Sequence, residues 1–305
     1  MTTAREIKRR IQSVRNMEQV TNALQAVSAS KVRKAQDAVL GTRPYARAAW
    51  EVIVNLGGTA DSTLHPLLTR EVEADGVLII LITADRGLCG AYNNNIIQTT
   101  LDFAKSIGVP VSYVTVGQKG RDLMWRLGKP IVAEFHDLPV VPSVIDVSPI
   151  AVTAVDEFLA GHVGEIYLAY TDFVNMLTQN PAIQPLLPLC KPQVGDQTPM
   201  TCVLELQPAD VTEYIYEPDA VTILDEVLPR LTEVQVYQAI LEAHASEHAA
   251  RMVAMGNATE NAKDLVMDLT LDYNKARQRS ITREILDIAG GAEALEQQRA
   301  AAGRS

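Results

Sequence analysis

The sequence predicts an α/β protein that combines a long antiparallel coiled coil of its N- and C-terminal helices with an α/β domain between them. Two observations predict this arrangement. Apolar residues at both ends of the chain recur every three or four positions, whereas the middle alternates apolar strands with helical stretches. The predicted divisions are the N-terminal helix at 1–56, the α/β domain at 70–215, the C-terminal helix at 222–290 and a tail at 291–305.

The N-terminal helix is predicted from a stretch without helix breakers, since Gly41 and Pro44 are the first glycine and proline of the chain. Steps of three and four separate the apolar residues Ile7, Ile11, Val14, Met17, Val20, Leu24 and Val27. Such a narrow stripe predicts a helix over residues 5–40 that packs against one partner.

The middle of the chain alternates predicted strands and helices. Strands are expected at 76–83, 109–116, 131–135 and 165–173, and helices at 93–106, 119–127 and 151–162. This alternation predicts a mostly parallel sheet with helices on its faces, in a Rossmann-like domain. Five prolines predict an irregular connection over 181–199, and residues 201–206 are expected to form an edge strand.

The C-terminal helix is predicted from a second stripe, which runs on after Pro229 without another proline. Its members are Val234, Tyr237, Leu241, His244, His248, Met252, Met255, Thr259, Ala262, Val266, Leu269, Tyr273 and Ala276. Their mean spacing is about 3.5 residues, the period of a left-handed coiled coil. A helix over 230–289 would extend about 90 Å, so it needs a partner along the stripe. The N-terminal helix is the natural antiparallel partner, and two helices lying flat on the sheet are the alternative.

Charge and composition restrict the classes of function. The net charge of -10 disfavours nucleic-acid binding. The first fifty residues nevertheless carry ten Lys and Arg against three Asp and Glu, which predicts a basic arm that seeks an acidic partner, or alternatively a mitochondrial transit peptide. No apolar run is long enough to span a membrane, and three cysteines are too few for a disulfide framework.

Three groups of residues could carry chemistry, and each has a structural alternative. The turn at 83–90 follows a strand as phosphate-binding turns do, but it lacks their glycine patterns, so Asp85 and Arg86 are expected to fasten the loop. His244, Glu247 and His248 match the H-x-x-E-H zinc pattern, although both histidines lie on the helix stripe. Cys89 is interpreted as a small buried residue. We therefore predict no catalytic, cofactor or metal site.

Several long motifs resemble one family across nearly the whole chain. They lie at residues 5–16, 29–36, 82–93, 214–218, 246–255, 257–262, 269–282 and 290–294. In this order they resemble the gamma subunit of F-type ATP synthase.

The resemblance implies a central rotor stalk that couples ion-driven rotation of the c-ring to conformational change, and hence to ATP synthesis or hydrolysis, at the beta subunits. It implies no catalytic site on this chain and no bound cofactor, since nucleotides bind to alpha and beta. The implied partners are the alpha, beta and epsilon subunits and the c-ring. The implied location is peripheral, at the cytoplasmic face of the energy-coupling membrane, most simply the bacterial plasma membrane.

The resemblance also implies roles for individual residues. Positions that contact beta subunits in the family match Arg251, Arg277, Gln278 and Thr282 on the C-terminal helix. Gln19 and Asn22 stand where the family is typically basic, and Leu24 replaces its usual methionine, which leaves Lys31, Arg33 and Lys34 as the basic candidates for beta contact. Positions that meet the c-ring match Tyr214 and Glu217. The expected coiled-coil seam includes Ile7, Ile11, Val14, Leu24, Leu241, Met252, Val266 and Leu269.

Two other functions are alternatives to this one. A nucleotide-binding α/β enzyme with helical extensions would bind ATP by itself, and a coiled-coil scaffold would bind neither ATP nor the catalytic subunits.

Overall fold

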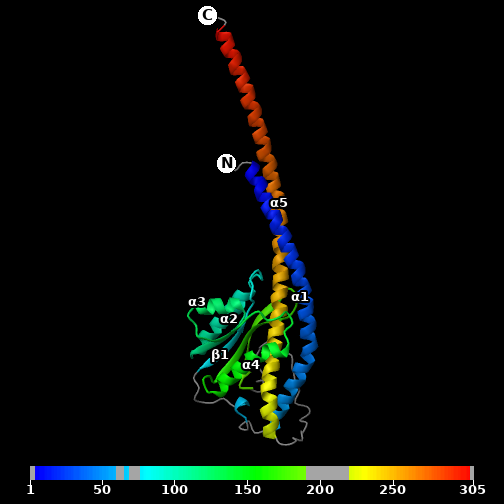
Figure 1. Ribbon diagram of the computed structural model, residues 1–305, viewed down its shortest axis with the longest axis vertical. Coiled ribbons are helices and arrows are strands. Elements are labelled where there is room, and N and C mark those ends of the chain that lie inside the picture. Colours follow the sequence, from blue (N-terminus) through cyan, green and yellow to red (C-terminus); the bar gives the residue numbers. More distant parts are fainter. Residues whose placement is uncertain (1–3, 60–64, 69–75, 190–219, 303–305) are drawn as a thin grey trace. The chain divides into compact units, whose positions relative to one another are not determined.

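A computed structural model describes residues 4–59, 65–68, 76–189 and 220–302 (Figure 1). The chain forms two compact units. The shaft unit consists of Met1–Gln25 and Met255–Ser305, and the sheet unit consists of Ala26–Ala254. Two long helices, α1 (Ala4–Thr59) and α5 (Ala220–Ala302), contribute residues to both units.

The sheet unit contains a five-stranded mixed sheet in the order β3-β2-β1-β4-β5. Its strands are β1 (Val77–Ile82), β2 (Val111–Val116), β3 (Ile131–Phe135), β4 (Glu165–Phe173) and β5 (Gln179–Leu187). Strands β1 to β4 run parallel to one another, and β5 is antiparallel to its neighbour β4. The prediction of a mostly parallel sheet is confirmed.

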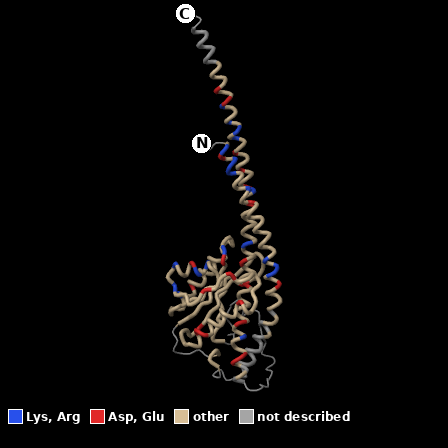
Figure 2. The backbone as a smooth tube through the Cα atoms, in the orientation of Figure 1, with Lys and Arg blue, Asp and Glu red and all other residues tan. Residues whose placement is uncertain are grey.

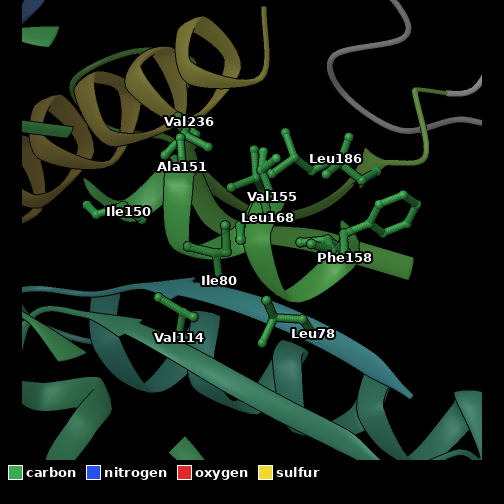
Figure 3. Close-up of a cluster of buried hydrophobic side chains, with 14 of the residues drawn as sticks. Leu78, Ile80, Val114, Ile150, Ala151, Val155, Phe158, Leu168, Leu186 and Val236 are labelled. Atoms are coloured by element: carbon green, nitrogen blue, oxygen red, sulfur yellow. The ribbon is translucent and has the colours of Figure 1, made fainter. Parts of the chain in front are cut away.

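The central strand β1 is buried along its whole length because helices cover both faces of the sheet. Successive side chains point to opposite faces, so β1 contributes to two cores. Leu78 and Ile80 belong to the core under α4 (Val144–Leu159), which also contains residues of α5, and Figure 3 shows them facing Ala151 and Val155. On the other face, Ile79 packs with residues of α2 (Tyr92–Ile107) and α3 (Gln118–Arg126).

Helices α2 and α3 begin and end within one residue of the predicted ranges, but α4 begins seven residues earlier than predicted. Its start is fixed by a capping box, in which the Ser143 hydroxyl accepts from the Asp146 N–H and the Asp146 carboxylate accepts from the Ser143 N–H. Pro149 lies inside this helix. The predicted start at residue 151 was therefore wrong, because the cap at Ser143 sets the start of the helix.

The stretch predicted as an irregular connection after Pro181 is partly a strand, because β5 contains Pro181 and Pro185. The prediction was wrong here. Strand β5 is the edge of the sheet, where a residue without an N–H is tolerated if its nitrogen points away from the neighbouring strand. The two prolines are four residues apart, so their nitrogens point to the same side of the strand. The predicted edge strand at 201–206 lies outside the described residues.

Helix α1 also continues past Gly41 and Pro44, the first helix breakers after the stretch at 5–40. The missing N–H of Pro44 leaves the carbonyl of Leu40 without its helical partner. Leu40 is exposed, so water can satisfy that carbonyl. The Thr42 hydroxyl oxygen, in the same turn, lies 3.1 Å from the carbonyl oxygens of both Ala38 and Val39.

Within the sheet unit, α1 and α5 pack together beside the end of β4. Val32, Ala35 and Val39 of α1 form a core with Phe173 of β4 and with the α5 residues Leu241, Ala245 and Ala249. The small side chains on α5 allow the helix backbones to approach closely.

In the shaft unit, the described residues belong only to α1 and α5, so these two helices bury each other. Ile7, Ile11 and Val14 of α1 are buried, and the Thr259 hydroxyl of α5 donates to Thr21 Oγ1 at 2.8 Å. On α5, Met255 and Thr259 are buried, and the half-buried positions that continue the stripe are Ala262, Val266, Leu269, Tyr273 and Ala276.

The buried line on α1 departs from the predicted stripe after Val14. Three predicted members are more than half exposed: Met17, Val20 and Val27. The least exposed residues instead continue in alternating steps of four and three through Glu18, Thr21, Gln25, Ser28, Val32, Ala35 and Val39, with Leu24 half-buried beside them. This alternation averages the 3.5-residue period that keeps a helix facing its partner. Two consecutive steps of three, from 14 to 17 to 20, turn the apolar stripe off that line.

Candidate functional site

The first candidate site is the carboxyl edge of the sheet between β1 and β4. In open α/β sheets, ligands bind at the point where the strand order reverses, and in this sheet that point lies between these two strands. The turn after β1 contacts α5 there, and Phe173 at the end of β4 packs against α1 and α5. The two long helices therefore occupy the place where a doubly wound domain usually holds its ligand.

The neighbouring position, at the start of α3, is filled by a carboxylate of the chain. Asp85 Oδ1 accepts from the N–H of Gln118, the first residue of α3, and Oδ2 accepts from the N–H of Asp137, both at 3.0 Å. A helix N-terminus attracts anions, and here the anion is Asp85 itself. A Cβ on Gly117 would overlap the carbonyl of Thr83, so this glycine serves close packing of the turn. The expectation that Asp85 fastens the loop is confirmed.

The pattern H-x-x-E-H on α5 does not present an open ligand set. The Glu247 carboxylate pairs with Arg251 at 2.6 Å, and His248 Nδ1 accepts a hydrogen bond from the same guanidinium at 3.2 Å. Burial lowers the pKa of His248 to about 3, and the charge of Arg251 acts in the same direction. His244 Nδ1 lies 3.3 Å from the Val140 carbonyl oxygen. Each of these side chains already has a partner within the sheet unit.

Two further residues of the turn after β1 are buried against α5. Burial raises the pKa of the Cys89 thiol, which lies in a small core with Ala84, Tyr92 and Ala250. The Tyr92 hydroxyl donates to the carbonyl of Ala243 at 3.1 Å, and burial raises its pKa well above the usual value. A nucleophilic role for Cys89 has no support in this environment. Cys190 and Cys202 lie outside the described residues.

The second candidate site is the exposed surface of α1 and α5. Figure 2 shows Lys and Arg in blue along the two long helices. Arg33 and Lys34 of α1 are exposed and Lys31 is half-buried. On α5, every side chain described between Arg277 and Ala292 is exposed. Gln278 and Thr282 lie in that segment, where the Thr282 hydroxyl bonds only to the backbone of its own helix. The exposed apolar residues of the segment are Ile281, Ile285, Leu286 and Ile288.

The remaining predicted positions fall into two groups. Leu241 is buried, and Met252, Val266 and Leu269 are half-buried on the α5 stripe. Tyr214 and Glu217 lie outside the described residues. Sequence reasoning missed the carbonyl oxygens of Arg86 and Gly87, which bind Arg251, because a backbone acceptor leaves no signal in the residue pattern. Within the described part of the chain, none of the helices combines the length and apolar character needed to cross a membrane.

A model of the ATP synthase family matches residues 3–295. The ATP synthase gamma chain of Dehalococcoides mccartyi is 46% identical over 297 residues, which cover 97% of this chain and 100% of the relative. The gamma chain of Herpetosiphon aurantiacus is 46% identical over 307 residues, again covering 97% and 100%. That of Moorella thermoacetica is 42% identical over 297 residues, with the same coverage.

Solved structures share the fold at lower identity. A rotor of the Euglena gracilis mitochondrial ATP synthase has a TM-score of 0.63 at 20% identity, covering 91% of this chain and 98% of that one. A central stalk and c-ring structure from Tetrahymena thermophila has a TM-score of 0.58 at 22% identity, covering 78% and 99%. The family match and the identity over whole relatives show that the chain belongs to the ATP synthase gamma-chain family, the central stalk of the rotor in an enzyme whose catalysis takes place in the beta subunits.

Proposed function

We propose that this chain couples ion-driven rotation of a c-ring to ATP synthesis and hydrolysis by turning inside a head of alpha and beta subunits. One observation supports this function above the others. In the shaft unit α5 pairs with α1 as far as Ala276 and then continues with every described side chain exposed through Ala292. A helix with apolar residues on such a surface needs a surrounding protein, and a head that encloses it supplies one.

The mechanism we propose is a population shift driven by contact. A two-helix shaft has different side chains on its different faces, so each beta subunit meets a different surface at each angle of rotation. A subunit moves toward the nucleotide state that makes the better contact with that face. The coupling is reciprocal, so nucleotide binding also drives the shaft.

The proposed contacts follow the family motifs and the exposure of the residues. For beta subunits they are Lys31, Arg33, Lys34, Arg251, Arg277, Gln278 and Thr282. Arg251 differs from the others because only 12% of its side chain is exposed, so a beta subunit would meet chiefly the loop that Arg251 holds. For the c-ring the proposed contacts are Tyr214 and Glu217, with the epsilon subunit binding nearby. The bacterial relatives support a location at the cytoplasmic face of the plasma membrane.

The decisive experiment is reconstitution. The chain is expressed with alpha and beta subunits of the same source, and ATPase activity is measured in the purified complex and in a complex that lacks this chain. Activity that depends on the chain is expected. A chain ending at Ala276 serves as the matched variant, and it should assemble with lower turnover because the exposed segment is gone.

Two outcomes would contradict this proposal. Saturable binding of labelled ATP to the isolated chain would favour the nucleotide-binding enzyme. Failure to co-purify with alpha and beta would favour the scaffold.

A further inference from the structure

The guanidinium of Arg251 attaches the turn after β1 to α5, beside the hydrogen bond from Tyr92 to the Ala243 carbonyl. Its Nη2 donates to the carbonyl of Arg86 at 3.1 Å, and its Nε donates to the carbonyl of Gly87 at 3.3 Å. These acceptors lie about half the chain away in sequence. They bring the loop at 85–90 onto the face of α5 that carries Glu247 and Arg251.

The guanidinium is held on its other side by α5 itself. Nη1 pairs with the Glu247 carboxylate at 2.6 Å and donates to His248 Nδ1 at 3.2 Å. The side chains of Arg251 and Glu247 are each only 12% exposed, so the ion pair is well shielded from water. Four acceptors around one planar fork require arginine, because a lysine ammonium has three donors and no fixed plane. The contact is therefore specific to this residue.

The attachment determines what the loop presents to its surroundings. Leu88 has a φ of 63°, which is uncommon for a non-glycine residue, and it is 65% exposed. Its neighbour Cys89 is 2% exposed, and Cys89 Sγ accepts from the Asn93 amide at 3.2 Å. The loop thus holds one side chain outward and the next inward. A loop in this backbone conformation persists only when its surroundings fix it.

The loop also continues directly from β1, the central strand of the sheet. A force on the sheet therefore reaches α5 through two kinds of contact, the apolar cores and a set of polar contacts to which the Arg251 attachment belongs. Apolar cores resist separation but are non-directional. The arginine fork, in contrast, defines one orientation of the loop on the helix.

We propose that Arg251 is a latch, a positioning residue that fixes the β1 turn on α5 so that the sheet and the long helix turn as one body. Its effect on the loop is independent of the rotor function. Its effect on coupling rests on the proposed function. The competing interpretation is a buried ion pair that only adds stability.

The loop is tested through the thiol of Cys89. In a chain carrying Cys190→Ser and Cys202→Ser, the rate of N-ethylmaleimide labelling is measured for Arg251→Gln, for Arg251→Lys and for the parent. Lys263→Gln is the matched control, because Lys263 pairs with Glu260 on the exposed surface of the same helix. We expect labelling to be about tenfold faster in Arg251→Gln, a smaller increase in Arg251→Lys, and the parental rate in the control. Labelling of Arg251→Gln within about twofold of the parent would overturn the latch. If Arg251→Gln does not fold, Arg251→Lys decides in the same way.

Coupling is tested in membrane vesicles that carry the complete complex. Arg251→Lys should lower ATP-driven ion pumping per ATP hydrolysed by about twofold or more, with less effect on hydrolysis. A role in stability alone would lower both activities together and leave their ratio unchanged, which would overturn the coupling part of the inference. If the parent chain restores neither ion pumping nor hydrolysis, the proposed rotor function is contradicted. The labelling experiment still tests whether Arg251 fixes the loop on α5.

Discussion

The hydroxyl of Thr42 on α1 donates a 2.7 Å hydrogen bond to Oε1 of Gln238 on α5. Gln238 is buried, and its amide nitrogen donates in turn to Oε1 of Glu242 at 2.9 Å. The link lies two residues before Pro44, just after the stretch at 5–40 that contains no helix breaker. Polar pairs between packed helices specify their register, because a shifted register leaves buried groups without partners.

Thr42→Val should destabilise the full-length chain by about 1–2 kcal/mol, because it removes a donor from the buried Gln238 carbonyl oxygen while keeping the side-chain shape. Urea unfolding followed by circular dichroism measures this. Thr270→Val is the control, since the Thr270 hydroxyl bonds only to Val266 O of its own helix. Equal losses in the two variants would contradict a role for the interhelical bond.

Stability should fall on acidification, partly because of His248. Its pKa is about 3 in the folded chain and near the ordinary histidine value of 6.5 when the chain is unfolded. Arg251, His244 and Lys31 face it and also disfavour its protonation. Between these pKa values only the unfolded state binds the proton. The contribution of His248 to the free energy of unfolding is therefore complete above about pH 6.5, and it decreases by about 1.4 kcal/mol per pH unit below that pH.

His248→Gln should reduce the slope of the unfolding free energy against pH by about 1.4 kcal/mol per pH unit, which is the contribution of one bound proton. The measurement is the free energy of unfolding from pH 7.5 to pH 4.5. His136→Gln, at an exposed position, should leave the slope of the parent in place. A parental slope in His248→Gln would show that other groups carry the dependence. Burial also lowers the pKa of His65, so a residual slope of the same sign is expected.

Leu269→Asp should destabilise the helix pair by at least about 2 kcal/mol, because it removes apolar contact and places a carboxylate between α1 and α5. Leu271→Asp is the matched control, since Leu271 lies two residues further along the same helix and is 60% exposed. Melting of the full-length chain distinguishes the two. If Leu269→Asp melts like Leu271→Asp, Leu269 does not lie on the seam.

Arg277→Ala combined with Gln278→Ala should lower ATP turnover of the assembled complex about fivefold, which corresponds to about 1 kcal/mol of lost contact with beta subunits. Both side chains are exposed, so assembly should be unaffected. Turnover and subunit stoichiometry are measured on the same preparation. Unchanged turnover in a complete complex would remove the pair from the proposed contacts.

Glu217→Lys should leave ATP hydrolysis by the soluble head intact and weaken ion pumping, because Glu217 is proposed to meet basic groups of the c-ring. An exposed ion pair contributes less than about 1 kcal/mol, so the loss of ion pumping should be clearest at raised temperature, where the contact between this chain and the c-ring is weakest. Acidification and hydrolysis are assayed side by side in vesicles. A parallel loss of both, or no change in either, would show that the c-ring contact lies elsewhere.

The chain of partners around Arg251 was not predictable from the sequence. Two of its four acceptors are backbone carbonyls about 165 residues away, and any residue type supplies such an acceptor. The motif that contains Arg251 indicated a surface contact with a beta subunit, whereas the structure buries its guanidinium against the turn after β1. Residues such as Arg277 could be assigned from the motif alone, because an exposed helix imposes no competing partner within the chain.

The sequence by itself determined the four parallel strands and the two long helices, because hydrophobic periodicity is a local property that each segment carries. The short apolar run Val77–Ile82 favours a strand covered on both faces, and the α5 stripe already has the coiled-coil period. Tertiary structure decided the rest. Polar residues such as Glu18 and Thr21 lie on the α1 seam, while the apolar Met17 and Val20 are exposed, because α5 selects the face it meets by geometry rather than by hydropathy. Strand β5 forms in spite of two prolines because only one of its edges has a neighbour, and that is a property of the assembled sheet.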